Sequence, residues 1–172
     1  MDIRTAIKSR RSIRKCKDKK IPPEPIKHLK EALIWAPSAG NLQARKFYFV
    51  YKESIRKKLS EGALGQEFIA KCPLVIVCCT DLDKIVTQYG ERGEKVYSVC
   101  DVSASIQNMM LAAAGDGLGT CWIGAFNEAR ISMIMNLPEG MRPIALVTVG
   151  YPDESPEPPK RASEKDVIEE IE

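Results

Sequence analysis

The chain has 172 residues, of which 44% are hydrophobic and 28% charged, and its formal net charge is +3. This length suits one domain, and the composition excludes a disordered or a membrane-spanning class, because no stretch approaches the ~20 apolar residues that cross a bilayer. No apolar run of the secretory type follows the charged N-terminus, so we expect a cytoplasmic protein.

Helical and strand patterns alternate in the first half of the chain. Asp2 can cap a helix that begins at Ile3. A second helix is predicted over residues 26–36, and Pro37 ends it. The elements that follow are a strand at 47–51, a helix at 54–62, a helical turn at 67–71 and a fully covered central strand at 74–80.

One long helix dominates the second half. Residues 83–95 are polar and contain two glycines, which predicts a mobile loop near a site. Residues 97–114 are apolar on more than one face, which predicts a buried central helix. The remaining elements are a strand at 120–123, a helix at 128–135, a strand at 144–149, a proline-rich extended arm at 153–159 and a short helix that Ser163 can cap. We expect a single domain over residues 1–172.

Cysteine and histidine usage disfavours a metal site. Cys78 and Cys79 are neighbours in a predicted strand, so their side chains point to opposite faces and cannot share one ion. His28 is the single histidine, and no C-x-x-C pair occurs. We expect six apolar thiols in a reducing compartment, at positions 16, 72, 78, 79, 100 and 121.

A basic segment near the N-terminus carries the groups that a phosphate monoester needs. Arg10 and Arg14 offer forked, permanently charged donors, and Ser12 adds a hydroxyl. The alternative is a basic helix end that neutralises the helix dipole. Nucleic-acid binding is disfavoured, because the segment lacks interleaved aromatic residues and any recognisable nucleic-acid module.

Two further segments suit a flat heterocycle. Residues 37–43 place an amide pair on a small-residue loop, and amides can match the alternating donors and acceptors of a ring edge. The alternative is an ordinary turn that uses Ser and Asn. Residues 117–124 supply backbone without bulk, so a ring can approach closely. Glycines 115, 117 and 119 follow a predicted helix and precede a strand, which is the reverse of a dinucleotide-binding fingerprint.

Together with Val149-Gly150-Tyr151-Pro152, these segments resemble the FMN-dependent nitroreductase family. The family carries an RRS-hydrophobic-R start, a PSxxNxQ loop, a GLGxCWIG segment and a closing VGYP, and the matches cover almost the whole chain. The resemblance implies an α+β fold, namely a three-layer α/β/α sandwich with a mixed, mostly antiparallel sheet. It also implies an intertwined homodimer in which residues 153–172 wrap the partner subunit and two FMN sites lie at the interface.

The resemblance also assigns cofactor-binding residues. It places Arg10 and Ser12 on the FMN phosphate, Arg14 near the ribityl chain or pyrimidine edge, and Arg161 as a further cation on the phosphate. The Gly124 N–H is the candidate donor to flavin N5. The full candidate set is Arg10, Arg11, Ser12, Arg14, Pro37, Ser38, Ala39, Asn41, Gln43, Ile123, Gly124, Ala125 and Arg161.

This chain departs from the family at two places. Ala44-Arg45 stands where Pro-Trp is usual, which leaves the stiffness of the preceding loop open, and Ala125 replaces a second glycine. The resemblance implies transfer of hydride from NADH or NADPH through flavin N5 to a nitroaromatic, quinone or similar acceptor. The alternatives are a flavin-holding or redox-sensing module without turnover, and a specialised dehalogenase or dehydrogenase branch. We expect no metal and no nucleic-acid or membrane partner.

Overall fold

The computed structural model describes residues 1–172 and contains a four-stranded sheet in the order β1-β2-β4-β3. Every pair of neighbouring strands is antiparallel. The strands are β1 (Arg45–Val50), β2 (Leu74–Asp81), β3 (Gly119–Ile123) and β4 (Met141–Gly150). The helices are α1 (Ile3–Ser9), α2 (Pro23–Ile34), η1 (Ala39–Asn41), α3 (Glu53–Gly62), α4 (Phe68–Lys71), α5 (Leu82–Arg92), η2 (Gly93–Tyr97), α6 (Ser98–Gly115), α7 (Glu128–Met135) and α8 (Glu164–Val167).

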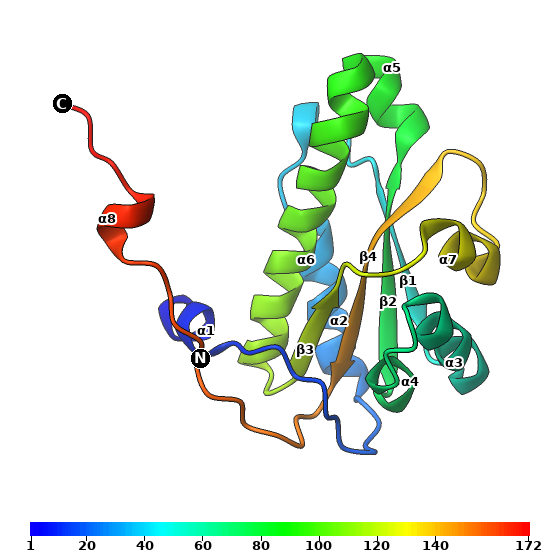
Figure 1. Ribbon diagram of the computed structural model, residues 1–172, viewed down its shortest axis with the longest axis vertical. Coiled ribbons are helices and arrows are strands. Elements are labelled where there is room, and N and C mark those ends of the chain that lie inside the picture. Colours follow the sequence, from blue (N-terminus) through cyan, green and yellow to red (C-terminus); the bar gives the residue numbers. More distant parts are fainter.

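Helices cover both faces of the sheet, as Figure 1 shows. Side chains of a strand alternate between its faces, and the central strand β2 is apolar on both. Leu74, Ile76 and Cys78 pack in one core with α2 and α6. The alternate residues pack in a second core with α3, α4 and α7. The three-layer α/β/α prediction is therefore confirmed, although the four strands are antiparallel throughout and the single parallel pairing is the isolated bridge Ser12–Thr120.

The long helix α6 lies in the middle of the first core, as its apolar pattern predicted. Val102, Ile106 and Met109 are fully buried. The helix α2 begins at Pro23, three residues before its predicted start, because a proline is tolerated in the first turn, where its missing N–H has no helical partner. The helix α7 has the predicted bounds.

The prediction of a mobile loop over residues 83–95 was wrong. The segment forms α5 and the π-helical turn η2. The Asp81 side chain caps α5 by accepting a hydrogen bond from the Lys84 N–H, and Ile85 is fully buried. Gly90, with φ of 54°, makes a kink within α5. The Asp81 cap and the buried Ile85 therefore stabilise α5 as a helix although most of its residues are polar.

The prediction of six free thiols was also wrong. Cys16 and Cys72 form a disulfide across 56 residues of sequence, with their Cα atoms 5.3 Å apart. Folding brings Cys16 to the end of α4, where Cys72 is fully buried. Cys78, Cys79 and Cys121 are buried thiols, whereas Cys100 is exposed. Burial raises the pKa of the Cys79 thiol to about 12.

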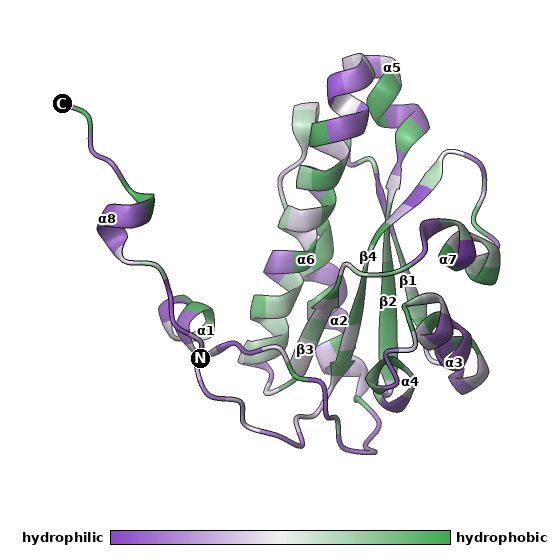
Figure 2. Cartoon of the chain, viewed as in Figure 1, coloured by the Kyte–Doolittle hydropathy of each residue, from purple (hydrophilic) through white to green (hydrophobic).

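Two further segments lie outside the layers of the sandwich, and both are mainly hydrophilic in Figure 2, apart from apolar residues at the end of the second. We call residues 10–19 the strap and residues 153–172 the arm. The strap crosses one end of the sheet, where the Ile13 N–H donates to the Thr120 carbonyl at 2.9 Å and the Lys17 N–H donates to the Tyr151 carbonyl at 2.8 Å. The arm is almost entirely exposed and ends away from the sandwich (Figure 1). None of the helices is both long and apolar enough to traverse a lipid bilayer.

Candidate functional site

The strap and the arm enclose a cavity of about 360 Å³ with strong positive charge. Five of the predicted residues line it, and they come from both ends of the chain. They are Arg10, Arg11, Ser12, Arg14 and Arg161, and the cavity they form is called here the arginine cavity. Glu157 is the one acidic residue in its lining, and Pro156 and Pro159 complete it.

Strand β3 fixes the position of the strap. Ser12 pairs with Thr120 in the parallel bridge, and the buried Ile13 lies against Gly119. A Cβ at Gly119 would lie 2.7 Å from the Cβ of Ile13, so only glycine permits this approach. Burial raises the pKa of the Cys121 thiol in the same strand, although Arg14 and Ser12 act in the opposite direction. Gly119 therefore allows the strap, which carries Arg10, Ser12 and Arg14, to lie directly against β3.

The first residues of the arm hold the strap from the other side. The Glu154 carboxylate accepts hydrogen bonds from the N–H groups of Arg14 and Lys15, and the Asp153 N–H donates to the Lys15 carbonyl at 2.9 Å. These bonds use the backbone of Arg14 and leave its exposed guanidinium free of partners within the chain. The Arg14 guanidinium can therefore bind a ligand while its backbone stays hydrogen-bonded to Glu154.

Arg11 differs from the other arginines of the cavity. Its Nη1 donates to the carbonyls of Lys8 and Arg10, at 2.7 and 2.9 Å. The guanidinium therefore satisfies carbonyls at the end of α1, which is the helix-end alternative considered for this segment. Arg11 lines the cavity, but its donors are already engaged. Arg10 makes no side-chain hydrogen bond or ion pair within the chain, so it remains available.

The predicted residues 123–125 lie where β3 ends. Ile123 is buried, whereas Gly124 and Ala125 are exposed. The Gln66 side chain donates to the Ala125 carbonyl at 3.0 Å and so fixes the turn. A strand rises about 3.3 Å per residue, which places Gly124 roughly 13 Å along the strand from Thr120. The cationic cavity and the exposed glycine are therefore two separated points on one strand.

The predicted loop at residues 37–43, called here the edge loop, contains three left-handed residues. Gly40, Asn41 and Gln43 have φ angles of 53°, 54° and 52°. The loop closes on itself because the Gln43 N–H donates to the Ser38 Oγ at 3.0 Å. Asn41 and Gln43 are exposed, so their amide groups face away from the core.

Within one chain, the edge loop does not meet the arginine cavity. The loop touches α6 at Asp101, and Ala114 near the other end of α6 lies beside Arg10. Thirteen helical residues separate these two points, and at 1.5 Å per residue they lie about 20 Å apart along the helix. The predicted site residues therefore form two groups, with residues 10–14, 123–125 and 161 around β3 and residues 37–43 at the far end of α6.

Two polar residues at the edge loop were missed by the sequence analysis. The Asp101 Oδ1 accepts a hydrogen bond from the Ala39 N–H at 2.9 Å. Arg45 donates to three carbonyls at the end of α2. A signal for Asp101 exists in the sequence, since it is the one charged residue within α6.

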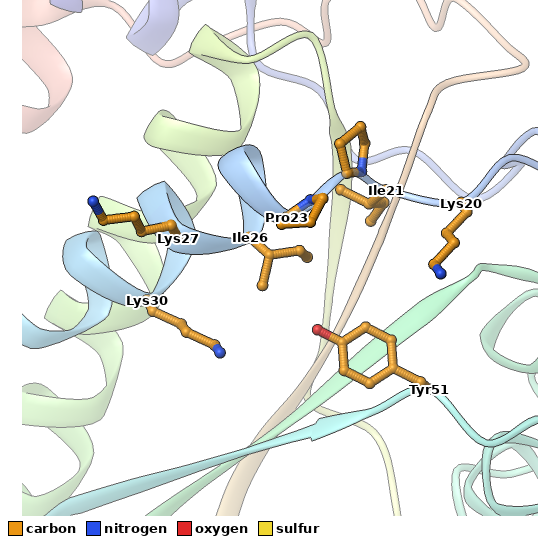
Figure 3. Close-up of a pocket in the computed structure, with 8 residues that line it drawn as sticks. Lys20, Ile21, Pro23, Ile26, Lys27, Lys30 and Tyr51 are labelled. Atoms are coloured by element: carbon orange, nitrogen blue, oxygen red, sulfur yellow. The ribbon is translucent and has the colours of Figure 1, made fainter.

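A second hollow, of about 610 Å³, contains none of the predicted residues. Figure 3 shows Lys20 and Lys30 on two sides of the Tyr51 ring, whereas Lys27, on α2, points away from it. Lys27 already pairs with Glu31 at 3.8 Å. The predicted phosphate-type donors therefore gather in the arginine cavity and not here.

Comparison with known proteins identifies the family of the chain. The model of the nitroreductase family matches residues 7–66 and 60–151. The chain belongs to the nitroreductase family. A candidate NADH dehydrogenase/NAD(P)H nitroreductase of Methanothermobacter thermautotrophicus is 34% identical over 162 residues, which cover 91% of this chain and 80% of that protein. The FMN reductase (NADPH) of Bacillus subtilis is 28% identical over 173 residues, which cover 91% of this chain and 70% of that protein.

Solved structures of nitroreductase-family proteins share the fold. The NADPH:FMN oxidoreductase from Vibrio harveyi, complexed with NAD+, superimposes with a TM-score of 0.90 at 25% sequence identity. The match covers 99% of this chain and 77% of that protein. The α+β nitroreductase architecture expected from the motifs is thereby confirmed.

Proposed function

We propose that this nitroreductase-family chain is an FMN-dependent oxidoreductase that uses NADH or NADPH to reduce a nitroaromatic, a quinone or a similar acceptor. The observation that carries the proposal is the arginine cavity, in which guanidinium groups and a hydroxyl converge near the start of β3, on the same strand that leads to the exposed Gly124. Relatives named FMN reductase support the choice of cofactor.

The donor set fits the phosphate of FMN. Arg10 and Arg161 supply permanent positive charge, and Ser12 supplies a hydroxyl donor. Guanidinium groups bind phosphate oxygens through paired N–H donors, which gives strong, charge-assisted hydrogen bonds. Four of the eight lining residues are arginines, so the cavity favours an anionic group. These residues hold and orient the phosphate end of the cofactor.

The far end of β3 suits the ring of the same cofactor. When bound, FMN supplies a ring that accepts a hydride from NADH or NADPH and passes electrons to an oxidised acceptor. Gly124 and Ala125 offer exposed backbone and little bulk, so a planar ring can lie against them. Arg14 can place its positive charge near the pyrimidine edge, where a reduced ring carries negative charge.

We propose a homodimer in which the edge loop completes the site of the second copy. Two observations support this. The edge loop carries the predicted ring-edge amides about 20 Å from the arginine cavity of its own chain. The arm also exposes apolar side chains with nothing against them, namely Val167, Ile168 and Ile171, which are 68%, 57% and 91% exposed. A partner that covers the arm would remove this apolar surface from water.

Spectroscopy of the purified protein tests the proposed activity. We expect FMN to bind and give a yellow protein that NADH or NADPH bleaches under nitrogen and that a quinone restores. A yellow protein that neither reductant bleaches would instead indicate a flavin-holding module. A protein that fails to bind added FMN would contradict the proposal altogether.

Truncation tests the proposed dimer. Removal of residues 153–172 deletes Arg161 and the exposed apolar residues of the arm. We expect light scattering to give a dimer for the full chain and a monomer with much weaker FMN binding for the truncated chain. A full chain that is monomeric and still binds FMN tightly would contradict the dimer proposal.

A further inference from the structure

The edge loop adopts a conformation that its own residues disfavour. Asn41 and Gln43 are both left-handed although each carries a Cβ, and glutamine is an unusual residue in that region. Such backbone geometry persists only where the surrounding structure holds it in place. The bonds that reach the loop from outside therefore indicate which residues maintain it.

Arg45 fixes the entry to the edge loop. Its Nη2 donates to the carbonyls of Ile34 and Ala36, at 2.8 and 2.7 Å, and its Nη1 donates to the carbonyl of Pro37 at 3.1 Å. These carbonyls follow the end of α2, where helical partners are lacking. The planar guanidinium thus bridges three carbonyls within residues 34–37, which lead into the loop, and a single ammonium group cannot reproduce this fork.

Asp101 fixes the middle of the edge loop. Its Oδ1 accepts a hydrogen bond from the Ala39 N–H, next to the first left-handed residue, Gly40. The side chain lies on α6 and is only 5% exposed, and its Oδ2 has no partner. Desolvation raises the pKa of Asp101, whereas the Ala39 N–H and the charge of Arg45 lower it. Arg45 and Asp101 thus act on neighbouring parts of one short segment.

The exit from the loop is anchored to the sheet. Ala44 is fully buried, and its carbonyl accepts hydrogen bonds from the Thr80 Oγ1 at 3.0 Å and from the Asp81 N–H at 3.1 Å. Arg45 thus fixes the entry to the loop and the Ala44 carbonyl fixes its exit. Residues 38–43 lie between these two anchors. The Asp101 bond is the one side-chain hydrogen bond from outside the loop that reaches this interval.

We propose that Arg45 and Asp101 are positioning residues that hold Asn41 and Gln43 in the arrangement which the flavin edge requires. The inference rests on the proposed FMN function. In this chain Ala44-Arg45 stands where the family usually has Pro-Trp. The Arg45 guanidinium and the buried Asp101 carboxylate would then supply the stiffness of the loop. Neither residue touches the cofactor; each acts through the loop backbone.

Hydrogen exchange and flavin binding on the full-length protein test the proposal together. We expect Arg45→Met and Asp101→Ala to speed amide exchange at residues 38–43 in flavin-free protein. In both variants the Kd of FMN should rise by about tenfold, a factor that corresponds to about 1.4 kcal/mol. The visible absorption and circular dichroism of bound flavin should also shift, because its edge loses fixed partners.

Conservative and remote variants separate positioning from general stability. Asp101→Asn keeps an oxygen acceptor for the Ala39 N–H and should restore most of the affinity, whereas Arg45→Lys should restore only part of it. Arg56→Met is the matched control, because Arg56 donates to the carbonyls of Tyr51 and Ala70 on the other side of the molecule. It should leave exchange at residues 38–43 and the flavin spectrum unchanged.

Two results would overturn the proposal. One is unchanged exchange at residues 38–43 in both Arg45→Met and Asp101→Ala. The other is faster exchange with wild-type FMN affinity and spectrum, which would mean that the loop is anchored but does not position the cofactor. Failure of the proposed function is recognised separately, because the unaltered protein would then bind no FMN.

Discussion

The strap and the edge loop are both short irregular segments, yet they are held in different ways. The strap is held through its backbone, by hydrogen bonds to Thr120, Tyr151 and Glu154, and by the Cys16–Cys72 disulfide. The edge loop is held through the side chains of Arg45 and Asp101. In the strap the side chains of Arg10 and Arg14 stay free and that of Arg11 bonds to carbonyls at the end of α1, whereas in the edge loop the backbone takes left-handed angles.

This difference suits the two kinds of group that each segment is proposed to bind. A phosphate dianion attracts flexible cationic side chains over several ångströms, so the strap needs only a fixed backbone. A ring edge needs hydrogen-bond donors and acceptors at defined angles, so the loop itself must be rigid. The following predictions test this contrast, and they begin with the strap because its covalent link has the largest expected effect.

Reduction of the Cys16–Cys72 disulfide should lower the free energy of unfolding by about 4 kcal/mol, because a closed loop of this length restricts the unfolded chain. Chemical denaturation with and without dithiothreitol measures the difference. Thiol titration of the denatured, unreduced protein should find four thiols out of six cysteines. Cys100→Ser is the control, since Cys100 is exposed and unpaired, and it should change stability little. Six titratable thiols in protein kept from reductants would contradict the cross-link.

The second-largest expected effect is weaker FMN binding after removal of a positive charge from the arginine cavity. Removal of one partner of a charged hydrogen bond costs about 1.5–3 kcal/mol, so Arg10→Ala and Arg161→Ala should each raise the Kd of FMN by roughly 10- to 100-fold. Fluorescence titration measures this. Lys19→Ala removes a cation of the same strap whose ammonium lies 4.3 Å from the centre of the Tyr151 ring, outside the cavity. An equal loss in Lys19→Ala would show that net charge matters and the cavity does not.

A methyl group at Gly40 should damage the edge loop without removing any charge. Gly40 has a φ of 53°, and a Cβ there would lie 2.3 Å from the Tyr89 Oη. We expect Gly40→Ala to destabilise the protein by about 1–2 kcal/mol through the backbone angle, with a further loss from the contact. Thermal unfolding measures the sum. The same change in a Tyr89→Phe background should cost less, because the hydroxyl is gone, and an identical cost in both backgrounds would refute the contact.

The smallest expected effect is the pH dependence of stability that comes from a contact between α2 and the end of α6. The hydrogen bond between His28 and Asp116, 2.9 Å long, raises the pKa of His28 above 6.5. A raised pKa means that the protonated form stabilises the fold, fully below pH 6.5 and progressively less as pH rises through the folded-state value. The pair is only partly buried, so solvent screens it. Unfolding of the wild type and of His28→Gln across this range should converge at high pH, and a gap that widens with pH would refute the assignment.

The sequence predicted those features that depend on short-range patterns. Helix α7 was placed from its apolar spacing, and Asn127 caps it by accepting a hydrogen bond from the Arg130 N–H. The strand β2 was predicted from one continuous apolar run. The cluster of Arg10, Ser12, Arg14 and Arg161 was predicted by family resemblance, and the structure brings these four residues together.

The features that escaped prediction depend on contacts between distant parts of the chain. The helix α5 looks polar, and its stability comes from the burial of Ile85 under the rest of the fold. Cys16 meets Cys72 only after the strap has crossed the end of the sheet. The bonds of Arg45 depend on how α2 ends relative to β1, which local sequence does not specify.

The contact between Arg14 and Glu154 joins residues 140 positions apart in sequence. A ribosome delivers the guanidinium groups of residues 10–14 early and Arg161 only after every strand has emerged. Under the proposed function, the phosphate site is therefore complete only after all four strands have been synthesised. A chain that ends before Arg161 should fold its sandwich and bind FMN weakly.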